Sequence, residues 1–342
     1  MPFTVIITRD FDQMSEVAAE IVIQRIQERL QEKASCILGL ATGNSPTGLY
    51  KHLAKAVNSG NIDAARIRTF NLDEYIGLPG ENAQQRALHP EGYSFFMIQE
   101  LFGLLQRKFG ATYVPWGTLV DQERLAAELA DHPEDWSEQG EDRGRAIVIR
   151  ADARSDYLKW IRREILDAYR EKIEADGGID LHVIGVGGRG HVAFHESGIP
   201  FEDNTMLLVR LDDNTVANAV ADGHFRSRKE SPCYAVSMGA ELVYRAGTVL
   251  LLANGTRKTA PVADSLLNDP TPLVPISYGQ IYARRGGDLI YVLDRAAAAR
   301  ILEQPERLRE RGIRLEDISA DGAKVRVREL TFARDPEMGQ MG

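Results

Sequence analysis

Short apolar runs recur along the whole chain and are bounded by glycine, asparagine and aspartate. Few of them alternate with polar residues, which is typical of strands covered on both faces, as in parallel sheets. The runs that we predict to be strands are residues 3–8, 36–42, 67–72, 146–150, 180–187, 234–239, 248–254 and 289–294.

Amphipathic segments lie between these runs. Residues 12–33 place their apolar side chains on one stripe, and residues 155–174 do the same. In the second segment Ser155 is the predicted N-cap, and Gly177 with Gly178 is the predicted stop. The alternation of strand and helix predicts an α/β fold, with a mostly parallel sheet and helices on both faces. Sites in such sheets gather at the carboxyl ends of the strands.

We expect residues 1–295 to form a single α/β domain. Within it, residues 116–145 are polar and acidic, and they are predicted to be an inserted helix and loop on the surface. Residues 296–342 are predicted to be a C-terminal extension, with a charged helix over 300–311 and a weak strand over 323–332.

Composition narrows the classes of partner and compartment. The chain has 342 residues and a formal net charge of -9, which favours neither nucleic acid nor an anionic membrane surface. Its N-terminus is too short and too charged for a signal peptide, and no apolar run approaches the length of a membrane span, so a cytoplasmic protein is predicted. Cys36 and Cys233 are too few for a disulfide framework and are predicted to be buried free thiols.

A glycine-rich turn follows an early apolar run and precedes an amphipathic helix. It consists of Thr42, Gly43, Asn44 and Ser45. Pro46 suits the first helical turn, because no N–H partner is required there. Exposed N–H groups at a helix N-terminus are a ready site for phosphate. The alternative is a plain helix start in which Ser45 is the N-cap and nothing binds, and the motif by itself leaves both interpretations open.

Two acidic residues, Asp73 and Glu74, follow the apolar run 67–72. A carboxylate at the carboxyl end of a strand is well placed for proton transfer. The alternative is a surface acidic pair or an aspartate that caps a helix, and this segment alone favours that alternative. His89 and Tyr93 follow in the next segment and are predicted either to line a site or merely to pack.

The segment GVGGRGHVAFHE, residues 185–196, directly follows a buried run. Its glycines have the spacing of a dinucleotide motif, but this signal is weak because no acidic residue about 20 positions later cleanly ends a second strand. A tight turn that presents His191, His195 and Glu196 together is favoured, since the two histidines would share one face of a helix. Imidazole beside a carboxylate suits acid–base chemistry near neutral pH. The order of the residues is not that of a metalloprotease, so no metal site is predicted; a structural glycine turn with a capping histidine is the alternative.

Five segments together resemble the glucosamine-6-phosphate deaminase/isomerase family in their order and approximate spacing. They are TGNSPTGLYKHL, FNLDEYIGLP, HPEGYSFFM, GVGGRGHVAFHE and LLLANGTRKT, within residues 38–260. The family has a Rossmann-like α/β fold related to that of 6-phosphogluconolactonases, so the resemblance implies a three-layer sandwich. It also implies conversion of glucosamine 6-phosphate and water into fructose 6-phosphate and ammonium, without metal or organic cofactor. Many members are homo-oligomers.

The resemblance implies a role for each matching residue. Asp73 would move a proton between C2 and C1 of a phosphorylated amino sugar. His191 would open the sugar ring, and Glu196 would hold and charge the imidazole. The residues that the resemblance implies for binding the phosphate are Thr42, Gly43, Asn44, Ser45 and Lys258. Arg189 does not match the family, and we also expect it to bind the substrate or its phosphate.

Three positions depart from the family's pattern. Arg189 stands where the family has an aspartate two residues before the ring-opening histidine, and His195 stands in AFHES where the family has AFNEP. Val220 stands where the family has a phosphate-binding arginine, and Arg226 or Arg228 from the same loop are candidates to compensate. Two alternatives therefore stay open: a hydrolase like the 6-phosphogluconolactonases, and a non-catalytic sugar-phosphate binding protein.

Overall fold

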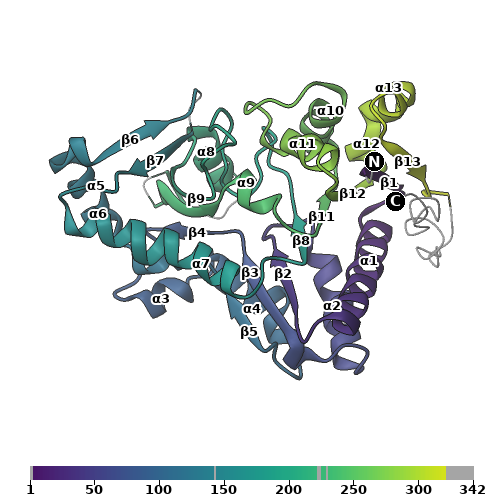
Figure 1. The fold of residues 1–342 in the computed structure, drawn as a ribbon, viewed down its shortest axis with the longest axis horizontal. Helices are drawn as coiled ribbons and strands as arrows, with labels where there is room; N and C mark the ends of the chain where they lie inside the picture. Colours follow the sequence, from purple (N-terminus) through teal and green to yellow (C-terminus); the bar gives the residue numbers. More distant parts are fainter. Residues whose placement is uncertain (1–2, 142–143, 222–224, 229, 321–342) are drawn as a thin grey trace, which may run out of the picture.

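The computed structural model describes residues 3–141, 144–221, 225–228 and 230–320, and its centre is a sheet of eight strands (Figure 1). Every neighbouring pair in this sheet runs parallel, which confirms the predicted fold class. In spatial order the strands are β13 (Arg314–Asp317), β1 (Phe3–Thr8), β12 (Asp288–Asp294), β11 (Thr248–Ala253), β8 (Leu181–Ile184), β2 (Cys36–Leu40), β3 (Ile67–Asn71) and β5 (Ala111–Tyr113).

Helices cover both faces of this sheet and make three layers (Figure 1). Successive side chains of a strand point to opposite faces. In β12, Tyr291 packs in one apolar cluster and Ile290 in the other, so the strand reads as a continuous apolar run. One face carries α1 (Phe11–Glu32), α2 (Thr47–Asn58) and α4 (Tyr93–Glu100), and the other carries α7 (Ala168–Ala175), α9 (Ala240–Val243), α10 (Thr259–Leu267), α11 (Tyr278–Arg284) and α12 (Arg295–Leu302).

A second sheet of five strands lies beside the first, and all its neighbouring pairs are antiparallel (Figure 1). The expectation that the runs 146–150 and 234–239 belong to the parallel sheet is therefore wrong. The pattern misleads because this sheet is also covered on both faces: Ile147 and Ala146 pack in separate apolar clusters. In spatial order its strands are β4 (Asp73–Ile76), β10 (Tyr234–Met238), β9 (Met206–Arg210), β7 (Arg145–Ile149) and β6 (Trp136–Gln139).

One long helical stretch joins the two sheets, and it begins and ends as the sequence predicts. Ser155 caps it by accepting a hydrogen bond from the Leu158 N–H at 3.1 Å, and it ends before Gly177. Its α-helical parts, α6 (Asp156–Trp160) and α7, are separated by a π-helical segment (Ile161–Asp167). Here the apolar positions recur every four residues, which exceeds the α-helical period of about 3.6. The wider turns keep Ile161 on the second sheet and Tyr169 on the first.

The acidic segment 116–145 contains α5 (Gln122–Asp131) and then, where a loop was expected, the edge strand β6. Leu125 and Leu129 of α5 are buried in an apolar cluster of the second sheet. The helix predicted over 300–311 is instead α12 followed by α13 (Pro305–Glu310), because proline has no N–H to continue the first helix. The predicted strand over 323–332 lies outside the described residues.

Three smaller findings complete the fold. Cys36 is buried in β2 as predicted, but Cys233 is exposed, because it precedes β10 and lies outside the sheet. Helices α3 (Ala83–Ala87) and α8 (Asp213–Ala221) connect strands around the second sheet. In the part of the chain that the structure describes, no helix is long and apolar enough to cross a membrane.

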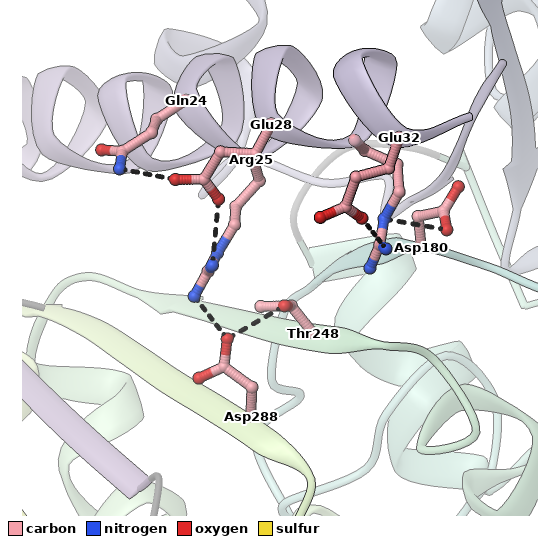
Figure 2. Close-up of polar contacts among 8 residues, drawn as sticks. Gln24, Arg25, Glu28, Glu32, Asp180, Thr248 and Asp288 are labelled. Carbon is pink, nitrogen blue, oxygen red and sulfur yellow. Dashed lines mark hydrogen bonds and ion pairs between the residues drawn. The ribbon is translucent and has the colours of Figure 1, made fainter. Parts of the chain in front are cut away.

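Ion pairs tie α1 to the amino ends of the parallel strands (Figure 2). Arg25 lies 2.6 Å from Asp288 of β12, and the Thr248 hydroxyl donates to the same carboxylate at 3.0 Å. Arg29 lies 3.2 Å from Asp180, just before β8. Charged residues at this end of the sheet thus fix a helix, whereas the candidate functional residues follow the carboxyl ends.

Candidate active site

The turn after β2 is open toward solvent. Gly43 has a φ of +93°, and a Cβ added there would meet nothing within 4 Å. Helix α2 begins at Thr47 without a side-chain cap, so the alternative prediction that Ser45 is its N-cap is wrong. The Ser45 hydroxyl instead donates to Asn254 Oδ1 at 2.7 Å. In the part of the chain that the structure describes, no side chain caps the N–H groups of the first turn of α2, as a phosphate site requires.

The segment after β11 reaches the turns that follow both β2 and β8. Its Asn254 accepts from Ser45, and Lys258 donates from Nζ to the Val186 carbonyl at 2.5 Å. The structure thus brings the predicted phosphate turn, Lys258 and the His191 turn together at the carboxyl edge of the parallel sheet. Asn254 was not predicted, although it lies within LLLANGTRKT, one of the segments that carry the family resemblance.

A tight glycine turn places His191. The Gly187 N–H donates to the His191 carbonyl at 3.0 Å, and the Gly190 N–H donates to the Gly187 carbonyl at 3.0 Å. A Cβ added at Gly187 would lie 1.8 Å from His191 Nε2, so the ring occupies space that any other residue would fill. The His191 side chain is 21% exposed, which leaves it accessible from solvent.

Glu196 is the buried partner of His191. His191 Nδ1 lies 3.2 Å from Glu196 Oε2, and the Thr215 hydroxyl donates to Oε1 at 2.7 Å. Burial by itself would raise the pKa of Glu196, but the charge and hydrogen bond of His191, with hydrogen bonds from Thr215 and the Asp212 backbone, lower it. Within the described residues, His191 Nε2 has no hydrogen-bond partner, so this nitrogen is available for proton transfer. No local sequence signal marked Thr215.

His195 does not share a face with His191, contrary to the prediction, because residues 185–203 form turns and no helix. It is fully buried, its Nδ1 accepts from the Ala240 N–H at 3.0 Å, and its Nε2 donates to the Ile199 carbonyl at 2.9 Å. Burial lowers the pKa of His195 to about 4. His195 is therefore a neutral side chain that fixes backbone segments.

Asp73 and Glu74 are both buried, so the alternative of a surface acidic pair is wrong. Glu74 accepts from the N–H of Tyr93 at 3.0 Å and from the N–H and hydroxyl of Ser94 at 2.9 Å, and it thereby caps α4. Among the described residues, none donates a hydrogen bond to the Asp73 carboxylate. Burial, with a smaller contribution from the charge of Glu74, raises the pKa of Asp73 well above its ordinary value.

Arg189 is joined to the start of α8. Its Nη1 lies 2.7 Å from Oδ2 of Asp212, and Asp212 is buried while Arg189 is 38% exposed. Arg228 also turns to this helix, where it lies 3.0 Å from Asp213, and Arg226 is exposed. The structure therefore gives both Arg189 and Arg228 acidic partners at α8.

Aromatic side chains line the second sheet next to Asp73. Tyr93 stacks on Phe194 with ring centroids 5.9 Å apart, and it also contacts Tyr75 at 5.0 Å. Val220 packs against the same apolar cluster. His89 and Tyr93 were predicted either to line a site or to pack. Tyr93 belongs to this cluster, whereas His89 lies in a turn, where it accepts from the Glu91 N–H. Within the described ranges, no three histidine, cysteine or acidic residues come together as a metal site.

Comparison with known proteins gives the family. No protein-family model matches the sequence. The glucosamine-6-phosphate deaminase of Thermoanaerobacter pseudethanolicus is 30% identical over 300 residues, which cover 88% of this chain and 96% of that enzyme. This chain belongs to the glucosamine-6-phosphate deaminase family. The deaminase of Clostridioides difficile is 31% identical over 297 residues, 87% of this chain and 96% of that enzyme.

Comparison with solved structures agrees with the fold. A monomeric glucosamine-6-phosphate deaminase superposes with a TM-score of 0.63 at 25% identity, covering 86% of this chain and 99% of that one. The 6-phosphogluconolactonase of Plasmodium vivax superposes with a TM-score of 0.55 at 13% identity, covering 89% and 95% of the two chains. The lactonase likeness shows a shared fold and does not favour lactone hydrolysis.

Proposed function

We propose that this protein converts glucosamine 6-phosphate and water into fructose 6-phosphate and ammonium. The observation that carries the proposal is one sheet edge with three features: an uncapped phosphate turn, a His191–Glu196 pair, and a buried Asp73 carboxylate without a donor in the described chain. The family membership supports the same reaction.

In this proposal the phosphate binds to the backbone of Thr42–Ser45, with Lys258 as the cation. The N–H groups and the positive end of the α2 dipole favour an anion there. Lys258 holds the neighbouring turn through the Val186 carbonyl, so phosphate binding and the position of the His191 turn are mechanically linked. Arg189 would contribute positive charge near this edge while keeping its contact with Asp212.

Ring opening is the step that we assign to His191. Its Nε2 takes the proton of the anomeric hydroxyl and returns a proton to the ring oxygen, which breaks the C1–O5 bond and leaves an open-chain aldehyde. The imidazolium that forms between these transfers is stabilised by Glu196 at Nδ1. Imidazole suits this shuttle because one ring can accept a proton and donate a proton near neutral pH.

Deamination is the step that we assign to Asp73. Its carboxylate takes the proton from C2 while O1 takes up a proton from water, which gives an enolamine. The carboxylic acid returns its proton to C1, and water adds to the resulting iminium carbon at C2. Ammonium then leaves and fructose 6-phosphate remains. A raised pKa makes Asp73 a stronger base for a carbon-bound proton.

The test is to incubate the purified protein with glucosamine 6-phosphate and to measure ammonium and fructose 6-phosphate together. Equal amounts of both are expected, and Asp73→Asn is expected to form neither at a comparable rate. Release of phosphogluconate from its lactone, without ammonium from the amino sugar, would contradict the proposal. Other phosphorylated amino sugars, tested in parallel, would identify the preferred epimer.

We also propose a cytoplasmic location, because phosphorylated sugars are charged and do not cross membranes unaided. Cell fractionation tests this proposal. The sequence resemblance favours a homo-oligomer, whereas the solved deaminase at 25% identity is described as monomeric. Light scattering of the purified protein would decide between the two states.

A further inference from the structure

The start of α8 holds Glu196 by the carboxylate oxygen that His191 does not use. Thr215, in the first turn of α8, donates to Oε1 at 2.7 Å, while His191 Nδ1 lies 3.2 Å from Oε2. Glu196 is 1% exposed, so water does not substitute for either partner. The two contacts together fix both the rotation and the charge of the carboxylate.

The surroundings leave Glu196 little freedom to move. A Cβ added at Gly144 would lie 2.3 Å from the Glu196 Cβ, so the backbone there packs directly on the side chain. Arg189 clamps the start of α8 to the His191 turn through Asp212 at 2.7 Å. A displacement of α8 would therefore move Glu196, and the movement of Glu196 would change its contact with His191.

Several charged or titratable groups lie on the elements that pack against Glu196. They are His191 and His195 from its own turn, Asp212 with its partner Arg189, the exposed Asp213 with its partner Arg228, and Arg145, which follows Gly144, with its partner Glu138. Both aspartates already have an arginine. Among these neighbours, Thr215 is the side chain that donates to Glu196 without a charge of its own.

We propose that Thr215 is a positioning residue for ring opening, whose hydroxyl keeps Glu196 ionised and aimed at His191 Nδ1. Thr215 acts through Glu196. This inference rests on the proposed function, because it assigns Thr215 to the step that His191 performs. Without the hydroxyl, the buried carboxylate would keep only its contacts with His191 and the Asp212 backbone, and Glu196 would take up a proton at higher pH. The imidazolium of His191 would then lose its anionic partner.

The test compares two substitutions at Thr215 with a matched control. Thr215→Val removes the hydroxyl with little change of shape, and Thr215→Ser retains it. Thr248→Val removes another threonine-to-carboxylate hydrogen bond of 3.0 Å, to Asp288 at the opposite end of the sheet (Figure 2). For each variant, kcat and KM for glucosamine 6-phosphate are measured across the acid pH range, together with thermal stability.

For Thr215→Val we expect the acid limb of kcat to move up by about one pH unit, which follows from the loss of a hydrogen bond to a charged group. KM should change little, since Thr215 does not touch the substrate. Thr215→Ser should restore the wild-type profile, and Thr248→Val should leave the profile unchanged whatever its effect on stability. A uniform fall of kcat with an unshifted acid limb would show a merely structural role and overturn the proposal.

A second readout does not depend on activity. The ring signal of isotope-labelled His191, identified by its absence in His191→Asn, reports by NMR when its carboxylate neighbour is protonated. Its acid inflection should move up in Thr215→Val and stay in place in Thr215→Ser. If the wild type forms no product while this inflection shifts, the proposed function fails and the positioning role stands. An inflection that does not move in Thr215→Val would overturn the positioning role even in an active enzyme.

Discussion

The corner between β3 and β4 and the turn after β8 each carry two candidate groups side by side, and in each region one of the two is committed to structure. At the corner, Glu74 is used by the N-terminus of α4, whereas Asp73 receives no hydrogen bond from the described chain. In the turn, both ring nitrogens of His195 form hydrogen bonds to the backbone, whereas Nε2 of His191 has no hydrogen-bond partner in the described chain. Residue type identifies the candidate groups, and their hydrogen bonds to the backbone show which member of each pair is structural.

The two regions also treat charge in opposite ways. Burial and the neighbouring Glu74 raise the pKa of Asp73, while His191, Thr215 and the Asp212 backbone lower the pKa of Glu196 against its burial. A carboxylate that takes a carbon-bound proton gains from higher basicity. A carboxylate that stabilises an imidazolium must stay ionised. The surroundings therefore shift the pKa of the same chemical group in opposite directions, as the two proposed tasks require.

The largest expected effect separates the two carboxylates of the corner. Asp73→Asn keeps the shape and removes the base, so kcat should fall by about 10⁴-fold, the upper range for a positioned acid–base group. Glu74→Gln should keep activity within about tenfold but lose about 2 kcal/mol of stability, since its amide hydrogens would face the N–H donors of α4. The measurements are kcat and urea denaturation. If Glu74→Gln were the slower enzyme, the two roles would be reversed.

The next effect separates the two histidines. His191→Asn removes the proton shuttle and should lower kcat by about 10³-fold with a small change in KM. His195→Asn is the matched control, because an asparagine oxygen can still accept from the Ala240 N–H. That variant should retain kcat within about threefold, given that its bonds reach only backbone groups. Equal losses of kcat in both variants would mean that residues 191–196 act as a unit. The hydrogen-bond partners would then not distinguish a catalytic histidine from a structural one.

The fold could be read from the sequence where burial alone sets the pattern. Six of the eight parallel strands and the helix α1 were predicted within two residues, except that the run 180–187 continues three residues past the end of β8, since continuous apolar runs and a helical stripe have direct causes in packing. The short edge strands β5 and β13 were not predicted. The assignment of 146–150 and 234–239 to the parallel sheet failed for the same reason. Both sheets are covered on two faces, so a strand's apolar run does not reveal which sheet it joins.

The candidate site could be read only in part. Asp73, His191 and Glu196 were predicted from chemistry and resemblance, and the structure places His191 and Glu196 in contact. The contact of Thr215 with Glu196 joins positions 19 residues apart in the chain, and it depends on where α8 begins. Asn254 and Ser45 are joined across 209 residues. Such pairs follow from the packing of separate elements, for which no local pattern exists.

Acid should destabilise the protein through the buried turn histidine. The pKa of His195 is about 4 in the folded state and 6.5 in its ordinary state, so the unfolded chain binds the proton first. Its contribution to stability is complete above about pH 6.5 and falls by about 3 kcal/mol as the pH drops toward 4. The pKa of His182 is also lowered to about 4, again by burial, and acts in the same direction.

The measurement is the free energy of unfolding against pH for the wild type and His195→Asn. The difference between the two curves isolates His195, because His182 and Asp73 titrate in both proteins and their contributions cancel. The curve of His195→Asn should be flatter between pH 6.5 and 4. Parallel curves would show that His195 is not neutral in the folded protein.

The smallest expected effect tests the phosphate turn against a glycine of the same backbone conformation. Gly43 and Gly178 have φ values of +93° and +81°, and a Cβ added at either would meet nothing within 4 Å. Alanine at either position should therefore cost only the left-handed conformation, about 1 kcal/mol of stability. Gly178 precedes β8 at the amino edge of the sheet, so only Gly43→Ala should raise KM for glucosamine 6-phosphate and the inhibition constant of inorganic phosphate, by about fivefold. If both variants bound phosphate equally well, the turn after β2 would not be the phosphate site, and the positive charge of Lys258 would have to act elsewhere along the sheet edge.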